Sequence, residues 1–216
     1  MPYLSTQNYL DYYSNSFATP VITVDLPLTW DTYIRQDTAT TNNDSSTALL
    51  IGELNSGAGK ICRGLIKIDW TSIPANRKFS AIQLLMTPTV DLADNASTMN
   101  AYRIKRDTNS TQATYNIWKT ANNWGTAGCK DSTNDYDGAN ILGTGSVAAS
   151  PTINAQITVL TFSNMVEMTK LYNGTYTDNG IVLFTTSELN DGIQYASTNH
   201  ATTAFRPVAR ATYILA

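Results

Sequence analysis

Residues 60–70, KICRGLIKIDW, alternate between apolar and polar side chains, and this pattern restricts the fold more than any other feature of the chain. Successive side chains of a strand point to opposite faces, so Cys62, Ile66 and Trp70 share one face and Arg63 and Lys67 the other. Similar stretches recur with turn-forming residues between them. We expect further strands at residues 21–28, 31–35, 47–53, 79–90, 99–107, 153–162, 180–186, 192–197 and 206–215.

One segment, SNMVEMTKLYNG at residues 163–174, has the periodicity of a helix instead. Asn164 is a candidate N-cap, Glu167 follows three residues later, and Gly174 is a candidate stop. Many short strands with one short helix predict an all-β fold, an antiparallel β-sandwich or barrel. The stretch 108–154 is polar and contains glycines, and we expect a long loop there.

The composition excludes several classes of function. Charged residues make up 14% of the chain, the formal charge is −3 and no basic stripe occurs, so nucleic-acid partners are not expected. No apolar run approaches the ~20 residues of a membrane helix, so we expect no membrane partner either. The N-terminus lacks the basic and apolar regions of a signal peptide.

Residues 1–30 read as an N-terminal arm followed by an edge strand that stops at Pro27, and residues 31–216 as one β-domain. The first 20 residues are too aromatic for a disordered linker. We interpret them as an arm that docks on its own domain or on a neighbour; a short helix across residues 6–15 is the alternative. The aromatic residues of this partner-binding arm are Tyr3, Tyr9, Tyr12, Tyr13 and Phe17.

Catalytic and nucleotide-binding signals are absent. The run LNSGAGK (54–60) lacks the GxxxxGK[ST] spacing and precedes a strand, so it is read as a hairpin turn. His200 is the only histidine, no GxSxG motif presents a serine, and we expect no enzyme. Cys62 reads as a small buried residue, and whether it pairs with Cys129 is left open.

Two kinds of binding site are suggested by the stretch 108–138. Asp131, Asp135 and Asp137 lie close together in a turn before a glycine, which suits Ca²⁺, although Asp is also an ordinary turn residue. Aromatic rings that could stack on sugars gather in the same stretch. Trp124 is the best candidate for exposure; for Trp118 we favour a core position that seals one end of the fold, and Trp70 is expected in the core. The candidate carbohydrate-binding residues are Trp124, Trp118 and Tyr136.

Several segments, in consistent order over about residues 31–215, resemble the DNRLRE-type (disaggregatase-related) domain. They are DTYIR (31–35), TNNDSSTALLIGE (41–53), CRGLIKIDWTSIPANRKFSAIQLLM (62–86), AYRIKR (101–106), STQATYNIW (110–118), FSNMVEMTKLYNGTYTDNGIVL (162–183) and AFRPVARATY (204–213). Tyr115 stands where the family usually has Trp. The resemblance implies a jelly-roll-like β-sandwich, usually a non-catalytic surface or carbohydrate-binding module on polysaccharide-active, archaeal surface or phage structural proteins.

From these features we expect a non-catalytic structural protein at a virion surface, either a capsid decoration (cement) protein or a tail or fibre component. Its partners would be copies of itself, assembled as a trimer, and a capsid or tail protein, with adhesion to polysaccharide as a further role. The alternative is a carbohydrate-binding module of a secreted polysaccharide-active protein or a cell-surface protein, located outside the cell. Ca²⁺ is the one cofactor considered.

Overall fold

The computed structural model describes residues 20–54, 59–92 and 95–215. In these ranges the chain is all-β with a single α-helix, as the alternation predicts. The aromatic residues of the expected N-terminal arm, Tyr3 to Phe17, lie outside the described residues.

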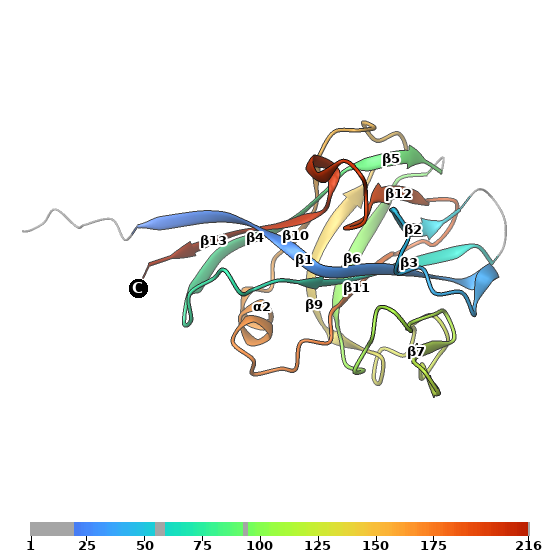
Figure 1. Cartoon of the computed structure of the whole chain (residues 1–216), viewed down its shortest axis with the longest axis horizontal. Helices are drawn as coiled ribbons and strands as arrows, with labels where there is room; N and C mark the ends of the chain where they lie inside the picture. Colours follow the sequence, from blue (N-terminus) through green and yellow to red (C-terminus); the bar gives the residue numbers. More distant parts are fainter. Residues whose placement is uncertain (1–19, 55–58, 93–94, 216) are drawn as a thin grey trace, which may run out of the picture.

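Eight antiparallel strands form a closed ring in the order β1-β13-β4-β10-β9-β6-β11-β3, because β3 pairs again with β1 (Figure 1). The strands of the ring are β1 (Val21–Arg35), β3 (Ile61–Ile68), β4 (Lys78–Met86), β6 (Ser97–Ile104), β9 (Tyr136–Val147), β10 (Ile157–Phe162), β11 (Ile181–Thr185) and β13 (Val208–Ile214). The expected antiparallel architecture is confirmed, but hydrogen bonding makes the sheet a barrel and does not divide it cleanly into the two sheets of a sandwich.

The remaining elements lie outside the ring. Three further strands, in the order β2-β12-β5, extend the sheet from β3. On this side β3 pairs with β11 at residues 64–66 and with β2 at residues 61–62. These elements are β2 (Ala48–Glu53), β5 (Pro88–Asp91), β7 (Ile117–Lys119), β8 (Asn122–Asn123), β12 (Ile193–Ala196), the helix α2 (Met165–Tyr172) and the 3-10 turns η1 (Gln36–Thr38) and η2 (Thr203–Phe205).

β1 is one continuous strand where the sequence pattern predicts two. Its first half pairs with β13 and its second half with β3, and the register shifts between Leu28 and Trp30 at the change of partner. Pro27 lies at this change, where its missing N–H breaks no ladder. Its carbonyl oxygen accepts a hydrogen bond from Asp69 N at 2.9 Å. The first half of β1 extends with β13 and β4 beyond the rest of the barrel (Figure 1).

β9 lies within the stretch where the sequence predicts a loop. Its polar, glycine-containing sequence hides the strand pattern, but the glycines have a structural reason. A Cβ on Gly143 would overlap Thr161 O of β10, and one on Gly145 would overlap Val159 O. β9 and β10 therefore approach so closely that side chains at these two positions must be absent.

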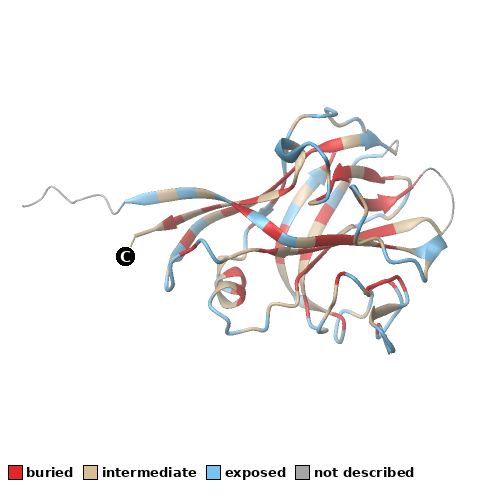
Figure 2. Cartoon of the chain, viewed as in Figure 1, coloured by how far each residue is buried: buried red, intermediate tan, exposed pale blue. Residues whose placement is uncertain are grey.

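The main hydrophobic core fills the barrel, and a second cluster lies on the outer face of β3, β6 and β11. Leu65, Ile104 and Val182 carry this outer face, and with Ile34 of β1 they pack against Tyr115 and Trp124 of the segment 105–135. Figure 2 shows the result: the central strands are buried along most of their length, while the first residues of β1 are exposed. β3 is thus covered on both faces, and the polar face predicted for it is wrong: Arg63 is buried.

The helix α2 begins and ends as predicted. The Asn164 side chain accepts a hydrogen bond from Glu167 N at 3.3 Å, which caps the first turn, and Gly174 adopts a positive φ of 75° after the last turn. Met168 and Leu171 bury one face of the helix in the barrel core. The helix thereby places Tyr172 and Asn173 at the rim of the cavity described below.

Candidate functional site

Trp124, the best candidate for exposure in the sequence, is buried: only 4% of it is accessible. Its indole Nε1–H donates to Thr114 O at 2.9 Å, and its ring packs in the outer cluster with Tyr115 and Cys129. The prediction of exposure is therefore wrong, because the glycine-containing loop folds back over β3 instead of projecting into solvent. A buried ring presents no face for a sugar.

The other two predicted sugar-binding residues also take part in packing. Tyr136 contacts Tyr102 and Phe184, with ring centroids 4.9 and 5.6 Å apart. Trp118 is half-buried against the same outer cluster. The structure brings Tyr136, Trp118 and Trp124 to one cluster, as the sequence suggests, but that cluster is a core.

Asp131, Asp135 and Asp137 each have their own protein partners. Asp135 is fully buried and accepts hydrogen bonds from three backbone N–H groups, those of Gly125 (2.6 Å), Thr126 (3.1 Å) and Asp131 (3.1 Å). Asp131 accepts from Thr133 N and Asn134, and Asp137 pairs with Arg103 at 3.1 Å. In the described part of the chain no three His, Cys, Asp or Glu side chains gather where they could hold a metal ion. Calcium binding in this loop stays a prediction.

Cys62 and Cys129 are both buried, free thiols that lie in different clusters. Burial raises the pKa of Cys62 to about 12 and that of Cys129 well above its usual value. His200 lies in the turn after β12, where its ring contacts Phe205 at 5.5 Å and accepts a hydrogen bond from Thr202 N.

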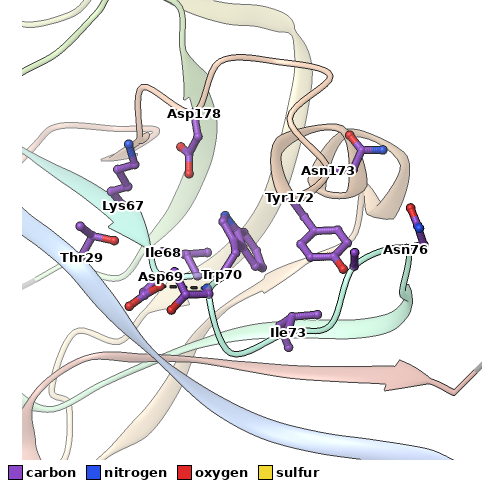
Figure 3. Close-up of a pocket in the computed structure, with 12 residues that line it drawn as sticks. Thr29, Lys67, Ile68, Asp69, Trp70, Ile73, Asn76, Tyr172, Asn173 and Asp178 are labelled. Atoms are coloured by element: carbon purple, nitrogen blue, oxygen red, sulfur yellow. Dashed lines mark hydrogen bonds between the residues drawn. The ribbon is translucent and has the colours of Figure 1, made fainter.

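A cavity of about 490 Å³ opens where β3 ends, between the segment 67–76 and the end of α2 (Figure 3). Trp70 lies in its middle, with Asp178 and Lys67 on one side and Tyr172 on the other. The sequence predicts Trp70 as a core residue, and its ring does pack against the core. However, the ring also lines this cavity.

Two aromatic rings, Trp70 and Tyr172, line the cavity, and Phe79 packs against both of them. Trp70 contacts Phe79 and Tyr172 with centroid distances of 5.8 and 6.0 Å, and Phe79 meets Tyr172 edge to face at 5.0 Å. The Tyr172 hydroxyl donates to Pro74 O and accepts from Arg77 N, which ties the helix to the loop after β3. The rings are therefore held in place before any ligand arrives.

The polar groups of the cavity include two carboxylates and one indole N–H, together with Lys67 and Asn76. Asp69 accepts from Thr71 N at 2.9 Å, and hydrogen bonds from Thr71 lower its pKa. Asp178 accepts from Gly180 N at 3.0 Å, and burial raises its pKa, opposed by Gly180 N–H, the charge of Lys67 and the Trp70 indole. The Trp70 Nε1–H is buried and completes no hydrogen bond. It lies near enough to Asp178 to affect the carboxylate without reaching bonding geometry.

The sequence contains a partial signal for this site. Trp70 follows the last apolar residue of a strand and precedes TSIPANR, so a loop begins beside the ring. Tyr172 and Asp178 are more than 100 residues away in the sequence, and only the packing of α2 and the pairing of β11 with β3 bring them to the same place. Local pattern therefore cannot identify the site.

Comparison with known proteins gives no assignment: no protein-family model matches the chain, and no curated protein matches it. Within the described ranges, no helix combines the length and the apolar character needed to cross a membrane.

Proposed function

We propose that this chain is a non-catalytic glycan-binding protein and that the cavity at Trp70 is its binding site. The observation that carries the proposal is the buried, unpaired indole N–H of Trp70, which lies beside the Asp178 carboxylate in a cavity of about 490 Å³. A buried donor without a partner costs about 1–3 kcal/mol, and a ligand that accepts its hydrogen bond recovers this cost.

Sugars match the chemistry of this cavity. Their C–H faces pack on aromatic rings, which Trp70 and Tyr172 supply, and their hydroxyls both donate and accept hydrogen bonds. Asp69, Asp178 and Asn76 add acceptors and donors around the rings. A location outside a cell or on a virion fits this function.

The finer fold that we propose is a jelly-roll-like sandwich drawn from the barrel. β1 changes partner along its length, from β13 to β3, whereas β9 pairs with β6 along most of its length and with β10 at two residues, Gly143 and Thr144. These two strands divide the ring into two arcs, β13-β4-β10 and β3-β11-β6, which would be the two sheets. The resemblance to DNRLRE-type domains supports this description and the non-catalytic role.

Glycan retention by variants tests the proposal. Trp70→Ala is expected to abolish binding to an array of oligosaccharides, whereas Trp118→Ala, in the outer cluster, is expected to leave it intact. Both variants are first compared with the wild type by thermal unfolding, so that loss of fold is not read as loss of binding. Retention lost with Trp118→Ala and kept with Trp70→Ala would return the site to the segment 108–138.

A second candidate function is assembly on a virion as a capsid decoration, tail or fibre component. The first half of β1 favours it. Among the described residues this half pairs only with β13, and Leu215 N donates to Pro20 O, so alternate residues face away from β13. Val21, Thr23 and Asp25 therefore present backbone N–H and C=O groups at a free edge, and Val21 is 62% exposed. Free strand edges bind further strands, here those of another copy or of a capsid or tail protein.

Size-exclusion chromatography with light scattering tests this second function. Thr23→Pro removes one outward N–H without removing a bond to β13, so it is expected to convert a trimer or other oligomer to monomer. Gly174→Ala, away from this edge, serves as the control. A wild-type chain that stays monomeric at high concentration, alone and with virion extract, would contradict assembly.

A further inference from the structure

The Trp70 cavity contains a hydrogen-bond donor, the indole N–H, and a charged acceptor, the Asp178 carboxylate, and this pair indicates the class of sugar that it would bind. Asp178 is held in place by the backbone at the start of β11. Its carboxylate accepts from Gly180 N at 3.0 Å, and Gly180 itself has a φ of 96° and lies so close to β3 that a Cβ would stand 2.8 Å from Ile66 O. Turning the carboxylate away from the cavity would therefore break its hydrogen bond to Gly180 N, whose own position beside β3 is fixed.

The Trp70 indole faces this fixed carboxylate with a donor that has no partner. The N–H completes no hydrogen bond, although Asp178 is near enough for the indole to lower the pKa of the carboxylate. The arrangement places an acceptor and a donor near each other without a hydrogen bond between them. One ligand hydroxyl can serve both groups, because a hydroxyl both accepts and donates.

A carboxylate or sulfate group cannot replace that hydroxyl. It has no proton to give to Asp178, and its negative charge would lie against a carboxylate that is already partly desolvated. Lys67 offsets one negative charge in the cavity, but Asp69 adds a second, so the lining has two carboxylates and one ammonium group. The net charge of the lining repels acidic ligands.

We propose that Trp70 and Asp178 together make the cavity selective for neutral sugars: one ligand hydroxyl accepts from the indole N–H and donates to the carboxylate, and acidic sugars bind more weakly. This inference rests on the glycan-binding function proposed above. It makes Asp178 a specificity-determining residue and gives the indole nitrogen a role separate from that of the ring face.

Isothermal titration with four hexasaccharides tests this: three neutral ones (β-1,4-glucose, α-1,4-glucose and β-1,4-N-acetylglucosamine) and one acidic one (α-1,4-galacturonate), at pH 7 and low salt. The wild type is expected to bind at least one neutral hexasaccharide and to bind the acidic one at least about tenfold more weakly. Trp70→Phe keeps an aromatic ring but removes the N–H, and the neutral affinity is expected to fall about five- to tenfold.

Asp178→Asn is the decisive variant because it removes the charge and keeps the shape. The ratio of neutral to acidic affinity is expected to fall about tenfold, while Asp107→Asn, the same change at an exposed position outside the cavity, leaves the ratio unchanged. Equal binding of neutral and acidic hexasaccharides by the wild type, or an unchanged ratio in Asp178→Asn, would overturn the inference and leave the glycan-binding function standing. Binding of none of the four overturns both.

Discussion

Asp31 gives the chain a pH-dependent stability whose size can be calculated. The side chain is buried within β1, where it accepts hydrogen bonds from Thr198 N (2.9 Å) and Thr198 Oγ1 (2.8 Å). Burial, with a smaller contribution from the charge of Asp44, raises its pKa from 3.8 to about 6 against the bonds from Thr198. The folded protein therefore holds this proton more tightly than the unfolded chain does.

The sign of the effect follows from that difference. Between about pH 4 and pH 6 the folded state binds more protons at Asp31 than the unfolded state, so the free energy of unfolding falls as the pH rises through this window. At about 1.4 kcal/mol for each tenfold difference in proton affinity, a rise from 3.8 to about 6 corresponds to about 3 kcal/mol. The stabilisation is complete below pH 4 and lost above pH 6.

Urea unfolding at pH 4, 5, 6 and 7, followed by tryptophan fluorescence, measures the effect in the wild type and in Asp31→Asn. The amide keeps the shape and can bond Thr198 through Oδ1 and Nδ2, but it does not titrate. The difference in unfolding free energy, wild type minus variant, is expected to fall by about 3 kcal/mol from pH 4 to pH 7. Asp107→Asn, at an exposed position, is the control. Parallel curves for the wild type and Asp31→Asn would refute the reasoning.

Three further predictions concern the stability and reactivity of the chain. Gly145→Ala is expected to lower the free energy of unfolding in urea by more than about 3 kcal/mol, because its Cβ would overlap Val159 O. Gly174→Ala has open space around its Cβ but a positive φ, and is expected to lower it by about 1 kcal/mol. Similar losses for both variants would contradict the close approach of β9 and β10. Asp135→Asn is expected to lower stability by about 3 kcal/mol because the carboxylate accepts three backbone hydrogen bonds, and a calcium titration of the same variant by thermal unfolding shows whether the loop binds the ion. The folded protein is expected to react with a thiol reagent only as it unfolds, because a pKa of about 12 leaves about one thiolate in 10⁴ for Cys62 at pH 8; rapid labelling of the native protein would be inconsistent with its burial.

Local pattern predicted most strands because their apolar residues alternate with period two. The segments predicted at 47–53, 180–186 and 192–197 are β2, β11 and β12 to within one or two residues, and the helix at 163–174 has the predicted cap. Two predicted boundaries failed for tertiary reasons. The strand predicted at 79–90 is two strands, β4 and β5, and those at 21–28 and 31–35 are one. The chain changes partners in both places, with a break between β4 and β5 and without a break inside β1, and a single strand's sequence does not show its partners.

The site was less predictable than the fold. The predictions for Trp124 and Trp70 were wrong in opposite directions. Trp124, in a polar loop, is buried, and Trp70, on an apolar strand face, lines a cavity. Exposure depends on which other segments cover a ring, and here the covering segments are distant in sequence. The prediction of a polar, exposed face on β3 was wrong for the same reason. Arg63 on that face is covered by other segments and forms an ion pair with Glu188 at 2.6 Å.

The two-partner path of β1 gives the molecule a direction-dependent mechanical strength. A force that pulls along β1 from residue 20 would load all seven residue pairs between β1 and β13 in shear at the same time. The residue pairs between β1 and β3 would then resist the same force. Val21 and Ile214 pair at one end of this ladder. A force that pulls these two residues apart would instead separate the same residue pairs one after another. The protein should therefore resist tension along this strand far better than tension that opens its tip.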